Sequence, residues 1–182
     1  ERVIFVVSGR PPHKEGWEVS PAEARYEMAA LATASNPTFE VSRLELDRAG
    51  PSYTADTMEW FRRSYGEEVR LYFITGGDAM LELMTWHEPE RLGRTCEFIA
   101  VMRPGYELGA LAEALGPELL SRTHVLEVTG VEVSSTELRR RAGSGESLRY
   151  LTPPAVANYI RNRRLYGSEQ SRRPLWGSHP EG

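Results

Sequence analysis

The residues best suited to chemistry lie in one short segment, Val133-Ser134-Ser135-Thr136-Glu137-Leu138-Arg139. Hydroxyls at a helix start, beside free backbone N–H groups and the positive end of the helix dipole, form a site for phosphate oxygens. An arginine one turn further along can add a charge-assisted contact. The alternative is an ordinary capping box of Ser134 with Glu137, which leaves the second hydroxyl and Arg139 unexplained. The segment therefore predicts a phosphate site.

A second candidate is Asp78, in the segment Thr75-Gly76-Gly77-Asp78 that directly follows a predicted strand. Two glycines let a ligand approach the backbone closely, and a carboxylate at the end of a strand can accept hydrogen bonds from ribose hydroxyls. The alternative is that Asp78 caps the following helix, and both roles can hold together. The pattern matches neither the dinucleotide fingerprint nor the P-loop, so it indicates a nucleotide only in combination with other segments.

Two further segments have both a functional and a structural interpretation. Lys14 ends the loop Gly9-Arg10-Pro11-Pro12-His13-Lys14, where an ammonium can hold a phosphate as a point charge or simply be solvated. Trp86 and His87 follow a predicted helix. The indole could stack on a flat ring, although packing is the more frequent role of a tryptophan, and a histidine is likewise more often structural.

The elements that must position these residues alternate between strand and helix. The predicted strands are 3–7, 39–46, 69–75, 97–102 and 124–128. The predicted helices are 20–35, 54–65, 79–84, 88–93, 108–115, 135–142 and 152–164. This alternation predicts an α/β fold, with a parallel sheet and helices on both faces. Ligands of such sheets bind outside the carboxyl ends of the strands, where these candidate segments are expected.

Composition excludes several classes of function. The chain has 182 residues, 40% of them hydrophobic, and a formal net charge of −4, which predicts a sizeable core and argues against a nucleic-acid binder with its basic face. No run approaches the roughly 18 apolar residues of a membrane helix. Cys96 is the only cysteine, so neither a disulfide nor a cysteine-based zinc site is expected within one chain. We therefore expect a cytoplasmic protein without a membrane or nucleic-acid partner.

Taken in order, five segments resemble bacterial nicotinate mononucleotide adenylyltransferase: SGRPPHK, GPSYTADT, TGGDAMLELMTWH, VSSTELR and RYLTPPAVANYI. The resemblance implies a Rossmann-like nucleotidyltransferase fold. It also implies the transfer of AMP from ATP, accompanied by Mg²⁺, to nicotinate mononucleotide. The products are nicotinate adenine dinucleotide and pyrophosphate, a late step in NAD synthesis. Whether the protein forms a homo-oligomer is left open.

The resemblance implies a role for each matching residue on the ATP side. Ser134, Thr136 and Arg139 match the family's Ser-x-Thr-x-x-Arg element, which holds the ATP phosphates. Asp78 matches a carboxylate near the nucleotide ribose, and Lys14 matches a lysine near the phosphates. Lys14 and Arg139 are thereby the expected catalytic residues, because they would neutralise the developing pyrophosphate.

On the acceptor side, three positions match the nicotinate-binding residues of the family. Thr54 matches a position that binds the nicotinate carboxylate through its backbone N–H, and Trp86 matches one that stacks on the pyridine ring. His87 stands where many relatives carry an aromatic residue, and a backbone contact would tolerate that change.

The sequence departs from the family pattern at its beginning. The family opens with a strand and a loop resembling GGTFDPxHxGH, whose histidines contact the α- and β-phosphates, and the four histidines here show no such spacing. We therefore expect residues 1–166 to be a nucleotidyltransferase domain that lacks its first strand and residues 167–182 to be a disordered tail. Two alternatives stay open. One is a related enzyme that uses nicotinamide mononucleotide or phosphopantetheine, and the other is a non-catalytic nucleotide-binding remnant.

Overall fold

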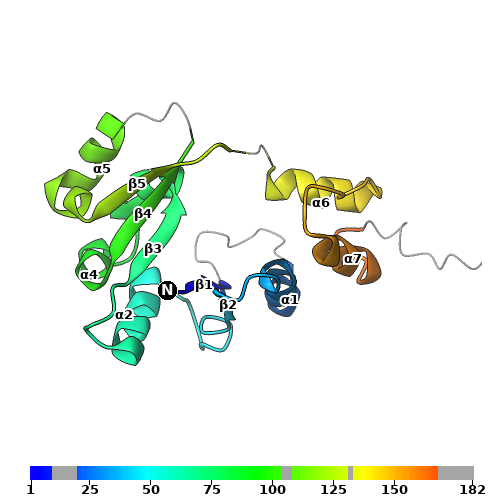
Figure 1. Cartoon of the computed structure of the whole chain (residues 1–182), viewed down its shortest axis with the longest axis horizontal. Helices are drawn as coiled ribbons and strands as arrows, with labels where there is room; N and C mark the ends of the chain where they lie inside the picture. Colours follow the sequence, from blue (N-terminus) through cyan, green and yellow to red (C-terminus); the bar gives the residue numbers. More distant parts are fainter. Residues whose placement is uncertain (10–19, 104–107, 131–132, 168–182) are drawn as a thin grey trace, which may run out of the picture. The chain divides into compact units, whose positions relative to one another are not determined.

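The computed structural model describes residues 1–9, 20–103, 108–130 and 133–167 (Figure 1). These residues form two compact units, which we call unit 1 (the described residues of 1–47 and 133–167) and unit 2 (those of 48–130). Lys14 and residues 168–182 of the predicted tail lie outside the described residues. No helix within the described ranges is long and apolar enough to cross a membrane.

Unit 1 contains a two-stranded parallel sheet. Its strands are β1 (Val3–Val6) and β2 (Phe39–Ser42), and helix α1 (Ala22–Thr33) connects them along the chain. Runs of β-branched and aromatic residues favour strands of this kind. The predicted strand 39–46 ends early because the chain turns there, with the backbone N–H of Leu46 donating to the carbonyl of Arg43 at 2.8 Å.

The rest of unit 1 is a helical layer formed by α6 (Ser135–Ser144) and α7 (Pro154–Asn162). Gly145 ends α6 in a left-handed conformation, with φ 74°, which glycine adopts without strain. A small apolar cluster joins the two helices to α1. Its buried members are Leu148, Val156 and Ile160, and Met28, Leu138, Ala142, Ala157, Leu165 and Tyr166 pack against them.

Unit 2 contains a three-stranded parallel sheet in the order β3 (Tyr72–Gly76), β4 (Glu97–Met102), β5 (Thr123–Glu127), drawn in green in Figure 1. The central strand β4 alternates between half-buried and buried side chains. Phe98 and Ala100 are fully buried, so β4 anchors the core of this unit. The parallel pairing confirms the predicted fold class.

Five short helical segments precede or separate these strands along the chain. They are α2 (Thr54–Tyr65), α3 (Gly77–Leu81), the 3₁₀ turn η2 (Leu83–Thr85), α4 (Pro89–Thr95) and α5 (Leu108–Ser121). The predicted helix 79–84 is thus divided between α3 and η2. The range of α5 contains two helical segments, because Gly116 has non-helical backbone angles (φ 69°, ψ 173°) and precedes Pro117. The first segment agrees with the predicted helix 108–115, and glycine permits the kink that follows it.

Replacing Gly143 with alanine is expected to lower the free energy of unfolding by about 1–3 kcal/mol. A Cβ at Gly143 in α6 would lie 2.6 Å from the backbone carbonyl oxygen of Tyr166, which cannot move aside as a flexible side chain can. Gly109→Ala is the control, because a Cβ there meets nothing within 4 Å. Urea unfolding followed by circular dichroism measures both variants. Equal midpoints for Gly143→Ala and the unchanged protein would contradict the packing argument.

Cys96 is expected to resist thiol reagents at pH 8 in the folded protein. Its side chain is 1% exposed, and burial raises the pKa of the thiol to about 12, against the opposing charges of Arg122 and Arg62. The unfolded chain loses this proton near the ordinary thiol pKa, so stability falls as the pH rises from about 9 toward 12. Modification followed by mass spectrometry checks the prediction, and rapid labelling without denaturant would contradict it.

Candidate functional site

The start of α6 in unit 1 presents the predicted phosphate-binding hydroxyls. Ser134 is the N-cap residue, and its Oγ accepts a hydrogen bond from the backbone N–H of Glu137 at 3.1 Å. The capping interpretation is therefore confirmed for Ser134, but only in half, because the Glu137 side chain binds arginines instead of returning to the cap. Ser134, Ser135 and Thr136 are all exposed, so their hydroxyls stay accessible to an anion.

Two of the three consecutive arginines of α6 are neutralised by acids. Arg140 binds Glu137 and also Glu146, with its Nη1 2.6 Å from Glu146 Oε1. Arg141 donates from Nε to Glu137 Oε1 at 2.8 Å. Hydrogen bonds from Arg140 and Arg141 lower the pKa of Glu137 to about 2, so this cluster stays ionised across the physiological range.

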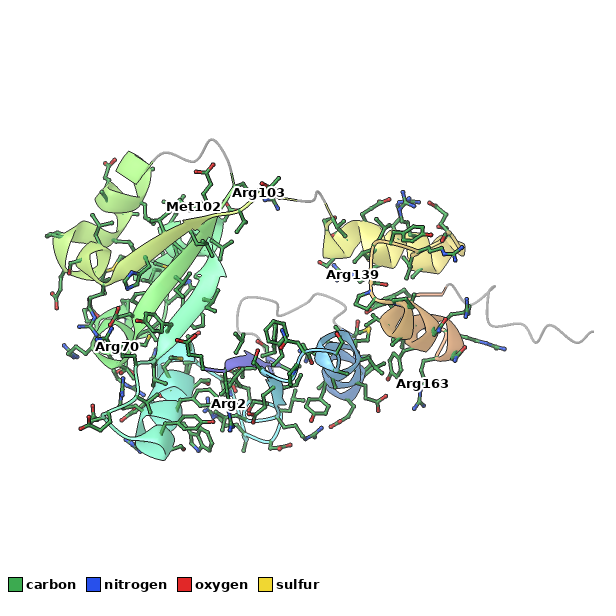
Figure 2. The ribbon with its side chains drawn as sticks, viewed as in Figure 1. Arg2, Arg70, Met102, Arg103, Arg139 and Arg163 are labelled. Atoms are coloured by element: carbon green, nitrogen blue, oxygen red, sulfur yellow. The ribbon has the colours of Figure 1, made fainter. Side chains whose placement is uncertain are left out.

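Arg139 differs from its two neighbours. Its one recorded partner among the described residues is Thr136, whose Oγ1 lies 3.4 Å from Nη2. No carboxylate in the described part of the chain pairs with Arg139, and its side chain extends from α6 into solvent (Figure 2). The charge of Arg139 therefore remains available one turn from the hydroxyls at the start of the helix, as a phosphate site requires.

Asp78 lies in the first turn of α3, two residues after the end of β3 at Gly76. It is exposed, and α3 has no side-chain cap, so the alternative capping role is wrong for Asp78. No hydrogen bond or ion pair joins Asp78 to another described residue. A Cβ at Gly76 would meet nothing within 4 Å, which leaves open space at the end of β3 where a ligand can approach the backbone.

The start of α2 in unit 2 is an uncapped helix end. Tyr53 is the N-cap residue but offers no side-chain hydrogen bond, and the first backbone bond runs from Thr57 N–H to Tyr53 O at 3.1 Å. The N–H groups of Thr54, Ala55 and Asp56 precede this bond and find no acceptor among the described residues. Such a helix end attracts an anion.

A buried hydroxyl marks the same helix end. Ser52 is 9% exposed, and its Oγ has no hydrogen-bond partner in the described structure. A buried unpaired hydroxyl is costly. It stands two residues before Thr54, so it adds an unsatisfied polar group where the backbone N–H groups are also free.

The segment Trp86–His87 lies against this helix end. The ring of His87 stacks on Tyr53, with centroids 4.0 Å apart and planes inclined by 29°. Trp86 is half-buried and packs edge-on against Phe73 of β3, at 5.8 Å and 81°. The structural interpretation of both residues is thus confirmed in part, and the half-exposed indole still leaves surface for a ligand ring.

The predicted site residues divide between the units. Unit 2 holds one group: Thr54, Asp78, Trp86 and His87. Unit 1 holds the other: Ser134, Thr136 and Arg139. A cavity of about 840 Å³ in unit 1 lies between α6 and α7, and none of these residues lines it.

Sequence reasoning missed two residues of the unit 2 site, Glu88 and Arg91, and the ring contact of a third, Tyr53, in the segment GPSYTADT. Tyr53 supports the ring of His87, while Glu88 and Arg91 form an ion pair beside it. The i, i+3 spacing of Glu88 and Arg91 was the available signal, since such pairs meet on a helix face.

Comparison with known proteins identifies the family to which this chain is similar. A family model described as cytidylyltransferase-like matches residues 1–141. The chain is 54% identical over 169 residues to a probable nicotinate-nucleotide adenylyltransferase of Moorella thermoacetica, with 91% of this chain and 78% of that protein covered. It is 50% identical over 166 residues to the protein of the same name from Thermus thermophilus, with 91% and 83% covered.

Solved structures agree on the fold. A Plasmodium falciparum nicotinic acid mononucleotide adenylyltransferase complexed with NaAD superposes with a TM-score of 0.69 at 16% identity, covering 91% of this chain and 82% of that one. At this identity the likeness concerns the fold alone. The family match and the curated relatives decide the membership: this chain belongs to the nicotinate-nucleotide adenylyltransferase family and has its cytidylyltransferase-like fold.

Proposed function

We propose that this nucleotidyltransferase transfers the AMP part of ATP to nicotinate mononucleotide, which yields nicotinate adenine dinucleotide and pyrophosphate. The name shared by the relatives supports the reaction. The observation that carries the acceptor assignment is the uncapped start of α2 beside Trp86–His87. That arrangement suits a flat ring bearing a carboxylate, because free N–H groups attract the anion and the indole offers an apolar face.

In this proposal the acceptor binds to unit 2. The backbone N–H of Thr54 donates a hydrogen bond to the nicotinate carboxylate, and the backbone N–H of His87 donates a second one. Trp86 stacks on the pyridine ring, and the edge-on contact with Phe73 keeps the indole in place. A neutral amide would gain less from a helix end than a carboxylate does.

The ATP phosphates are assigned to the start of α6 and the ribose to Asp78. Ser134 and Thr136 offer hydroxyls, and Arg139 offers a guanidinium that no described acid neutralises. Lys14 is proposed as a second cation near the phosphates. Mg²⁺ would enter with ATP as part of the substrate. Among the described residues, no three His, Cys, Asp or Glu side chains could hold a metal ion together.

The chemistry needs positioning and charge stabilisation. The 5′-phosphate oxygen of the acceptor attacks the α-phosphorus of ATP in line, and the bond from that phosphorus to the bridging oxygen of pyrophosphate breaks. No covalent enzyme intermediate forms. Arg139 would stabilise the charge that develops on the leaving pyrophosphate. A location in the reducing cytoplasm, where the thiol of Cys96 stays free, belongs to the same proposal.

Pyrophosphate release tests the proposal. The gene product, with any residues encoded before Glu1, is incubated with Mg²⁺-ATP and, in separate reactions, nicotinate mononucleotide, nicotinamide mononucleotide or phosphopantetheine. We expect turnover with nicotinate mononucleotide and a product of the mass of nicotinate adenine dinucleotide. Faster turnover with another acceptor would reject the substrate assignment, and ATP binding without turnover would favour a non-catalytic nucleotide-binding protein.

A further inference from the structure

Arg91 is the centre of an ion cluster that joins α4 to α2. Its guanidinium donates to Asp56 and Glu59, both on α2, with Nη2 2.7 Å from Glu59 Oε2. It also donates to Glu88, the residue that precedes α4. One side chain therefore binds three carboxylates, two on α2 and one just before α4. Arg91 follows Asp56 by 35 residues and Glu59 by 32 in the sequence, so the contact with α2 is long-range.

The cluster continues into the proposed acceptor subsite. Glu88 Oε2 lies 3.3 Å from His87 Nε2, and the His87 ring stacks on Tyr53 at the head of α2. Glu88 has a left-handed backbone, with φ 52°, which is uncommon outside glycine and persists where surrounding contacts hold it. The chain of contacts thus starts at Asp56 in the first turn of α2, passes through Arg91 and Glu88, and returns to that helix at Tyr53.

The charges of the cluster bear on an anionic ligand. Arg91 and Arg63 face Asp56, Glu59 and Glu88, and Arg63 binds only Glu59 among the described residues. Removing Arg91 would leave Asp56 and Glu88 without this cation, near the helix end where the acceptor carboxylate is proposed to bind. Their negative charges would then repel the acceptor carboxylate. The hydrogen bond that Arg91 donates to Asp56 raises the pKa of Arg91, so this guanidinium carries its charge at any working pH.

We propose that Arg91 is a positioning residue that holds Trp86–His87 against the start of α2 and favours an acceptor with a carboxylate over the corresponding amide. The inference rests on the proposed function for its substrate. Arg91 would act through Glu88 and His87, because the proposal places no direct contact between Arg91 and the acceptor.

Steady-state kinetics of Arg91→Met tests the inference against the matched control Arg63→Met. Both arginines bind Glu59, but the side chain of Arg63 is 76% exposed and that of Arg91 is 29% exposed. For Arg91→Met we expect the KM for nicotinate mononucleotide to rise about tenfold, the loss of one net interaction, with kcat and the KM for ATP within about twofold. The preference for the acid over the amide should fall by a similar factor. Arg63→Met should leave all of these values within about twofold.

Two further variants keep the test decisive. Glu88→Gln weakens the link to His87 while Arg91 stays bound to α2. This variant should raise the KM for nicotinate mononucleotide and leave the KM for ATP unchanged. Arg91→Lys retains the charge without the planar fork and should recover part of the acid preference. Folded Arg91→Met and Glu88→Gln proteins with an unchanged KM for nicotinate mononucleotide and an unchanged acid-to-amide ratio would overturn the inference.

Hydrogen exchange separates this inference from the proposed function. The backbone N–H of Trp86 donates to Leu83 O at 3.0 Å, and peptides covering Thr85–Glu88 should exchange faster in Arg91→Met than in Arg63→Met. Equal exchange in the two variants would overturn the positioning role, whatever the substrate. An unchanged protein that is inert with nicotinate mononucleotide would instead reject the proposed function.

Discussion

Replacing Arg139 with methionine is expected to lower kcat/KM for ATP by about 10²–10³-fold, the usual effect of losing one donor to developing charge. Arg139 is the cation of α6 that no described carboxylate neutralises, and it stands one turn from the hydroxyls of Ser134 and Thr136. Initial rates of pyrophosphate release at varied ATP concentration measure the effect. The KM for nicotinate mononucleotide should change little.

The matched control is Arg140→Met, one residue along the same helix. Arg140 already binds Glu137 and Glu146, so its removal takes away surface ion pairs rather than a free cation. We expect its kcat/KM for ATP to stay within about threefold of the unchanged protein, because exposed pairs contribute little. Equal losses in the two variants would mean that Arg139 has no special role at the phosphates.

Replacing Trp86 with alanine is expected to raise the KM for nicotinate mononucleotide by about 10- to 100-fold. Stacking of a base on an aromatic side chain contributes about 1–3 kcal/mol, and the pyridine ring is assigned to the half-exposed indole. The KM for ATP should stay nearly constant, because Trp86 is assigned no contact with it. Acceptor titrations at saturating ATP measure the change.

Trp60→Ala controls for the general loss of an indole. Trp60 lies on α2 in the same unit, is 46% exposed and contacts Phe61 edge-on. We expect kinetics close to those of the unchanged protein. If Trp86→Ala stayed folded and kept its KM for the acceptor, or if Trp60→Ala showed the same rise, the stacking assignment would fail.

Much of the fold could be predicted from local patterns. Strand β4 has the bounds of the predicted strand 97–102. Helix α6 begins at Ser135, as predicted, and ends two residues after the predicted helix 135–142. Where boundaries differ, a backbone turn, a glycine kink or a side-chain contact to the backbone interrupts the predicted element. The predicted strand 69–75 begins only at Tyr72, because the carbonyl of Val69 accepts a hydrogen bond from Arg62 at 2.6 Å instead of pairing in the sheet.

The candidate site was predictable where its residues are neighbours in the sequence. The hydroxyls and Arg139 follow one another on α6, so spacing alone indicated them. The Arg91 cluster and the stacking of Tyr53 on His87 join segments more than 30 residues apart, and no local pattern contains that information. The roles assigned to the predicted site residues, Asp78 and Lys14 among them, stay predictions.

An amide NMR titration of the protein with nicotinate mononucleotide and, separately, with nicotinamide mononucleotide tests the proposed acceptor site. In that proposal the acceptor carboxylate binds at the start of α2 beside Trp86–His87. We predict that the backbone amide resonances of Thr54, Ala55 and His87 shift with the acid and shift much less with the amide. Shifts confined to other residues, or equal shifts with both ligands, would contradict the claim.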